Sequence, residues 1–140
     1  MISRSLIIAG PTQERTVERA KLQAVNPVLP SRDVRASIEF YVTRLGFSLL
    51  FQDSTDEPRY AGLRRDAVEI HVQWHDPAEW AAVERPMLRF VVPAVQALFE
   101  EYSDEGVFHG RTAVRETAWG TREFAFYDPD QNGLTFYCDL

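Results

Sequence analysis

The chain has 140 residues, of which 45% are hydrophobic and 26% charged, so it is long enough to bury one full core without disulfides or a structural metal. Its single cysteine, Cys138, excludes an internal disulfide and a cysteine-rich zinc site, and it fits a reducing cytoplasm. The net charge of −6, with Arg64-Arg65 as the one adjacent basic pair, argues against nucleic acid as a partner and favours a cationic or small neutral ligand.

Residues 1–23 are predicted to be an N-terminal appendage, because the segment 12–23 is mostly polar and its few apolar residues form no stripe. A short amphipathic helix, a disordered arm and an upstream start codon all remain open for it. The apolar run 6–9 is too short for a membrane-spanning helix or a signal peptide, so we expect no membrane partner. One folded domain is expected over residues 24–140.

The first half of this domain predicts a strand at 25–30 followed by a helix, for which Ser31 or Asp33 supplies the N-cap. Gly46 is a natural C-terminal stop for that helix. The helix carries one apolar stripe, formed by Val34, Ile38, Tyr41 and Leu45. Three strands are predicted to follow, at 47–52, 59–64 and 67–74.

The same pattern then repeats. A strand at 88–92 precedes a helix that Gly106 ends, and the helix stripe is Val95, Leu98, Phe99 and Tyr102. Three more strands are expected, at 112–116, 122–127 and 134–138. The chain is therefore predicted to have an α+β fold of two paired βαβββ modules, about residues 24–80 and about residues 86–140.

Five short motifs stand at the turns and helix ends of this pattern. They are Val28-Leu29-Pro30-Ser31-Arg32-Asp33-Val34, Ile38-Glu39-Phe40-Tyr41, Arg44-Leu45-Gly46-Phe47, Trp119-Gly120-Thr121-Arg122-Glu123-Phe124 and Asp128-Pro129 through Asn132 and Phe136. Over residues 24–137 the chain resembles the vicinal-oxygen-chelate superfamily of glyoxalases, bleomycin resistance proteins and dioxygenases, and within it the bleomycin-binding resistance proteins. The resemblance implies a half-open barrel and a cytoplasmic homodimer with ligand grooves between subunits, and it leaves open whether the first strand is exchanged.

Metalloenzymes of that superfamily take their metal ligands from the first and last strands of each module. The positions that resemble those ligand sites are Asn26, the Pro86-Met87 neighbourhood, Glu69 and Thr135. Only Glu69 is a strong ligand, and three such ligands are typical of a catalytic site. His71 and His75 lie about 13 Å apart on a strand and cannot share one ion. We therefore predict no metal and no cofactor.

Strand alternation gives the segment 67–74 an apolar face and a polar face bearing Glu69, His71 and Gln73. The matching face of the last strand carries Thr135 and Tyr137. Such a lining binds through hydrogen bonds and negative charge, and it presents no catalytic constellation, although a solvated sheet edge would look the same. Phe51 and Trp74 are expected in the core.

Trp119 precedes Gly120 in a turn, where its ring is placed either to stack on a planar ligand or to pack at a subunit contact. Asp53 and its acidic neighbours Asp56 and Glu57 would attract a cationic ligand. The favoured function is sequestration, without chemical change, of a cationic aromatic antibiotic or metabolite, for which the resemblance implies a bleomycin-like ligand. The alternatives are a metal-dependent lyase or dioxygenase that uses Glu69 and His71 atypically, and a sensor or immunity protein for another aromatic metabolite.

Overall fold

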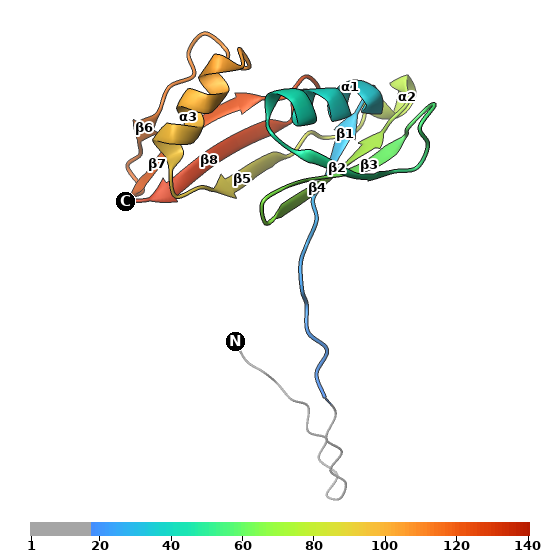
Figure 1. The fold of residues 1–140 in the computed structure, drawn as a ribbon, viewed down its shortest axis with the longest axis horizontal. Coiled ribbons are helices and arrows are strands. Elements are labelled where there is room, and N and C mark those ends of the chain that lie inside the picture. The colour runs from blue at the N-terminus through green and yellow to red at the C-terminus, as the bar shows by residue number, and fades with distance from the viewer. Residues whose placement is uncertain (1–17) are drawn as a thin grey trace, which may run out of the picture.

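The computed structural model describes residues 18–140 and contains two modules of the same topology (Figure 1). The first module comprises β1 (Val28–Ser31), α1 (Val34–Glu39), a π-helical turn η1 (Phe40–Arg44), β2 (Ser48–Gln52), β3 (Tyr60–Arg65) and β4 (Val68–Trp74). A one-turn helix, α2 (Pro77–Trp80), leads to the second module. That module comprises β5 (Met87–Val91), α3 (Val95–Asp104), β6 (Arg115–Glu116), β7 (Thr121–Tyr127) and β8 (Gly133–Asp139).

Each module forms one four-stranded mixed sheet. The strand orders are β1-β4-β3-β2 and β5-β8-β7-β6, with the first strand of each module parallel to the last and the other pairs antiparallel. The predicted α+β fold of two βαβββ modules is thus confirmed, and neither sheet closes into a barrel.

The two helices lie on the same side of the sheets, α1 against β3 and β4 and α3 against β7 and β8 (Figure 1). The strand residues beneath them are buried, because alternate side chains of a strand share one face. This core includes Leu29, Ala61, Leu63, Ile70 and Val72 in the first sheet, and Phe90, Phe124, Phe126, Leu134 and Phe136 in the second. No helix within residues 18–140 has the length and apolar character needed to cross a membrane.

A buried polar network joins the second module to α1. The Asp128 carboxylate accepts hydrogen bonds from the Tyr41 hydroxyl at 2.7 Å, the Asn132 side-chain amide at 2.9 Å and the backbone N–H groups of Asp130 and Asn132. Asp130 in turn accepts from Arg32 and Ser37. The turn between β7 and β8 is therefore a structural clamp on the start of the first module.

The predicted ends of several elements needed correction. β1 begins at Val28 rather than at residue 25, since the sheet hydrogen bonds of β4 reach back only to the Pro27 carbonyl. β6 covers two residues rather than 112–116, because Thr112 and His109 bond the edge of β7 through their side chains. α2 was not predicted, although Asp76 and Glu79 form a capping box around Pro77.

Asp33, one of the two predicted N-caps of α1, accepts a hydrogen bond from the Ala36 N–H and fills that role. Gly46 and Gly106 follow the helical segments with φ values of +80° and +70°, a conformation that favours glycine. The predicted appendage lies largely in residues 1–17, outside the described residues. Its described part, with the start of the expected domain, runs away from the sheets without regular structure (Figure 1).

Candidate functional site

The helix-free side of the first sheet is termed the first open face. Cross-strand pairing fixes its members, because paired residues point to the same side of a sheet. They are Val28 and Pro30 of β1, Ser48 and Phe51 of β2, Tyr60, Gly62 and Arg64 of β3, and Glu69, His71 and Gln73 of β4. The strand alternation therefore places Glu69, His71 and Gln73 together on one face, as the sequence analysis expected.

Four side chains of the first open face form a continuous hydrogen-bonded chain. The Arg64 guanidinium donates to Glu69 Oε1 at 3.0 Å, and Glu69 Oε2 lies 2.7 Å from His71 Nε2. On the other side of the ring, His71 Nδ1 lies 2.7 Å from the Tyr60 hydroxyl. Both ring nitrogens and both carboxylate oxygens are thus occupied by neighbouring side chains.

The Phe51 ring covers this chain from β2. It stacks beside Tyr60 and meets His71 edge-on, with ring centroids 6.2 and 5.3 Å apart. The ring lies over Gly62, where an added Cβ would come within 2.2 Å of Phe51 Cε2. Phe51 remains 44% exposed, so its prediction as a core residue was wrong. Trp74 is half-buried against the core, with the Arg59 guanidinium 4.2 Å from its ring.

The reason for the error at Phe51 is a β-bulge. The pairing of β2 with β3 shifts between Leu49 and Phe51, which inserts Leu50 as an extra residue. A regular strand would have turned Phe51 toward the helices. The bulge turns it toward the open face instead, where it forms an aromatic surface.

Two acids, Glu69 on the first open face and Asp53 in the β2–β3 loop beside it, have lowered pKa values. The hydrogen bond from His71 lowers the pKa of the Glu69 carboxyl most, burial opposes this, and the Arg64 guanidinium lowers the pKa further. Hydrogen bonds from the backbone N–H groups of Arg59 and Tyr60 lower the pKa of Asp53, the Arg59 bond contributing most. Asp53 therefore closes the β2–β3 loop, whereas Asp56 and Glu57 lie exposed in that loop.

The second open face, on β5, β7 and β8, carries the remaining predicted strand residues. The Thr135 hydroxyl donates to Met87 Sδ at 3.2 Å and is buried, while the Tyr137 ring lies 4.2 Å beneath the Arg89 guanidinium. Arg89 also contacts Glu123 at 3.3 Å. This face exposes Met87, Val91 and Tyr127, which are 53%, 68% and 47% accessible.

Three predicted residues lie outside both faces, and Asp53 in the β2–β3 loop is one of them. Asn26 is exposed in the segment before β1, and Trp119 is 70% exposed in the turn before β7. Of the eight predicted site residues, Glu69 and His71 are joined by a direct hydrogen bond. Gln73 lies on the same face of β4, Thr135 and Tyr137 lie on the second sheet, and the remaining three lie in loops or ahead of β1.

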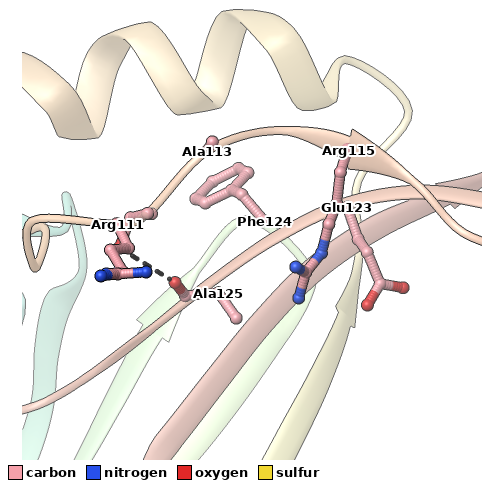
Figure 2. Close-up of a pocket in the computed structure, with 7 residues that line it drawn as sticks. Arg111, Ala113, Arg115, Glu123, Phe124 and Ala125 are labelled. Atoms are coloured by element: carbon pink, nitrogen blue, oxygen red, sulfur yellow. Dashed lines mark hydrogen bonds between the residues drawn. The ribbon is translucent and has the colours of Figure 1, made fainter.

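The edge of the second sheet contains a small hollow of about 100 Å³ that sequence reasoning did not foresee (Figure 2). It lies where the segment 111–115 bows away from β7, and the Thr112 hydroxyl bridges to the Ala125 carbonyl beside it. Arg111 and Arg115 stand at its two ends. Two guanidinium groups against the one carboxylate of Glu123 give this lining a net positive charge, which disfavours a cationic ligand.

The donors at the four positions that resemble metal ligands do not fit a metal site. Asn26 is exposed, Thr135 is buried against Met87, and both oxygens of Glu69 already accept hydrogen bonds. Within residues 18–140 no group of three or more His, Cys, Asp or Glu side chains is arranged to hold a metal ion.

Comparison with known proteins identifies the family. The model of the Glyoxalase/Bleomycin resistance protein/Dioxygenase superfamily matches residues 23–136. The chain belongs to this superfamily. It is 28% identical to the bleomycin resistance proteins of Geobacillus stearothermophilus and Staphylococcus aureus, over 83% of this chain and 96% of each relative.

Solved structures agree with this assignment. The bleomycin-binding protein of Streptomyces verticillus, solved with copper(II)-bleomycin, superposes with a TM-score of 0.69 at 29% identity, covering 87% of this chain and all of that one. The bleomycin resistance determinant encoded on the transposon Tn5 has the same fold, with a TM-score of 0.71 at 22% identity over 84% of this chain and 98% of its own.

Tyr60, Phe51 and Arg64 are the site residues that the sequence analysis missed. Tyr60 and Arg64 alternate with Gly62 on β3, so strand period alone could have placed them on one face. Their contacts with β4 depend on the register between strands, which alternation does not determine.

Proposed function

We propose that this protein binds a cationic, aromatic antibiotic of the bleomycin type and sequesters it in the cytoplasm without changing it chemically. The observation that carries the proposal is the first open face, where the exposed Phe51 ring meets His71 edge-on and His71 bonds to the Glu69 carboxylate, whose pKa is lowered. Planar cations bind to such pairs through stacking and charge attraction. The relatives named as bleomycin resistance proteins supply the ligand class.

The side-chain chemistry supports binding rather than catalysis. His71 bonds to Glu69 on one side and to Tyr60 on the other, and this hydrogen-bonded series of side chains includes no serine, cysteine or lysine nucleophile. A metal-dependent lyase or dioxygenase would need Glu69 and His71 to exchange these partners for an ion. That alternative is therefore not favoured.

We further propose that two copies of the chain form a homodimer with the ligand between them. Apolar side chains are exposed on the second open face, and Leu22 and Val25 are exposed ahead of β1. A second copy of the chain would remove this apolar surface from water. Light scattering at working concentration should give twice the chain mass, and a monomeric mass would contradict the shared site.

Titration with bleomycin tests the binding function. Trp119 is the exposed tryptophan, whereas Trp74 and Trp80 lie under arginine side chains, so a fluorescence change should come from Trp119. Calorimetry on the wild type and on Trp119→Ala should show saturable binding that the substitution weakens by about 1–3 kcal/mol, as hot-spot truncations do. Absence of heat and saturation at high micromolar bleomycin would end the proposal for that drug.

A further inference from the structure

The hydrogen-bonded series of side chains Arg64–Glu69–His71–Tyr60 has a fixed direction of donation. Arg64 can only donate, and the ionised Glu69 carboxylate can only accept. Since Glu69 Oε2 lies 2.7 Å from His71 Nε2, that nitrogen carries the proton. In a neutral ring the other nitrogen, Nδ1, then has a lone pair and accepts.

This direction determines what Tyr60 offers to a ligand. The Tyr60 hydroxyl lies 2.7 Å from His71 Nδ1, so its proton points at the ring. The lone pairs of the phenolic oxygen remain on the first open face. Tyr60 lies there beside Phe51 of β2 and opposite Gln73, its partner on β4. Tyrosine hydroxyls usually serve as donor or acceptor interchangeably, but here the donor role is already used.

We propose that the Tyr60 oxygen is an acceptor subsite for an N–H group of the ligand, with its direction imposed by Arg64, Glu69 and His71. The inference rests on the proposed function and deepens it, because it specifies which chemistry of a cationic ligand is recognised at one atom. A ligand presenting only acceptors at this point is rejected, since two acceptors face each other without a proton between them.

Protonation of His71 reverses this direction. Both ring nitrogens then donate, Nδ1–H donates to the Tyr60 oxygen, and the phenolic O–H turns toward the ligand. The charged and titratable groups facing the ring are Tyr60 from β3, Glu69 from β4 and, through Glu69, Arg64. The neighbours from β2 and β1, Phe51 and Val28, are apolar. Affinity for an N–H donor should therefore fall as His71 takes up its proton.

The first experiment needs no ligand. Histidine ring ¹H–¹⁵N spectra of the full chain should show His71 as the Nε2–H tautomer, and Glu69→Ala should abolish that preference. Glu79→Gln is the matched control, because Glu79 pairs with the separate histidine His75. An Nδ1–H tautomer for His71, or an even mixture in the wild type, overturns the inference.

The second experiment is calorimetry with bleomycin on the wild type and Tyr60→Phe. The variant should bind about five- to tenfold more weakly, the loss expected for one neutral hydrogen bond. As the pH is lowered, the affinity of the wild type for bleomycin should fall with the same midpoint as the His71 protonation seen by NMR. The affinity of Tyr60→Phe should fall less over the same pH range. Equal affinity and equal pH dependence in both proteins overturn the inference while leaving the proposed function intact. A wild type that does not bind bleomycin overturns the proposed function and this ligand assignment together. In that case the tautomer spectrum still confirms or refutes the direction of the hydrogen bonds from Arg64 to Tyr60.

Discussion

The clamp around Asp128 gives a stability prediction of defined size. The Asp128 side chain is 3% exposed and accepts four hydrogen bonds of 2.7–2.9 Å, two of them from backbone N–H groups. In Asp128→Ala, water entering the turn can satisfy the two backbone donors. The Tyr41 hydroxyl and the Asn132 amide remain buried without an acceptor, each at a cost of about 1–3 kcal/mol. Loss of the buried charge offsets part of this, so we expect about 3 kcal/mol of destabilisation.

Urea unfolding measures this loss, and Tyr41→Phe makes it specific. The Tyr41 variant removes one donor to a carboxylate, which is worth about 1.5–3 kcal/mol. In the Tyr41→Phe background, Asp128→Ala should cost about 1–2 kcal/mol less than in the wild type, because the two residues share a contact. The exposed Asp104 at the end of α3 is the control, and its replacement by alanine should change stability by less than about 0.5 kcal/mol.

The pH dependence has a defined sign. Burial, partly offset by the hydrogen bonds from Asn132 and Tyr41, raises the pKa of Asp128. The folded chain therefore holds this proton to a higher pH than the unfolded chain does. The contribution of Asp128 to stability falls as pH rises from the ordinary aspartate pKa through the raised value, and is constant above it. A loss below 1 kcal/mol in Asp128→Ala, or a wild-type advantage that grows with pH in that window, would refute the reasoning.

Three further predictions concern the metal and the first open face. Elemental analysis after purification without added metal should find no stoichiometric transition metal, whereas about one tightly held Zn, Ni, Mn or Fe per chain would contradict the donor-set argument. Gly62→Ala should displace Phe51 and cost about 1–3 kcal/mol of stability in urea unfolding, and the added change Phe51→Leu should restore part of it if the clash is the cause. Replacing the exposed loop acids in Asp56→Asn/Glu57→Gln should slow bleomycin association in stopped-flow measurements and flatten its dependence on ionic strength, and an unchanged salt dependence would exclude steering by this loop.

The sequence predicts the fold well because the two modules use local signals. Helix stripes, the glycine stops and strand alternation each act within about ten residues, and the repetition of the whole pattern supports each half independently. The missed features are those that depend on partners across strands. β6 is short because side chains of His109 and Thr112 replace its ladder, and no local pattern indicates this.

The site shows the same division. Alternation correctly grouped Glu69, His71 and Gln73, but Asp53 was interpreted as free charge although its carboxylate closes the loop onto the N–H groups of Arg59 and Tyr60. Phe51 was misplaced because a single inserted residue at the bulge reverses the face of every residue after it. The contacts that give the site its chemistry thus depend on register, which is a property of two strands.

The two open faces have the same topology and carry one Arg–Glu ion pair each, but they differ in whether their aromatic ring is covered. On the first, Glu69 pairs with Arg64 and the Phe51 ring is exposed; on the second, Arg89 pairs with Glu123 and covers Tyr137. An aromatic group of the proposed ligand is therefore better accommodated on the first face, while its acceptor groups would be better placed against the arginine of the second. If a dimer brings the first face of one copy opposite the second face of its partner, the ligand meets an exposed ring on one side and an arginine on the other, which complement its aromatic and acceptor ends. One copy supplies only half of that complementarity. A variant held monomeric by breaking the interface should therefore retain the stacking contribution to binding but lose its preference for which end of the ligand lies on the first open face.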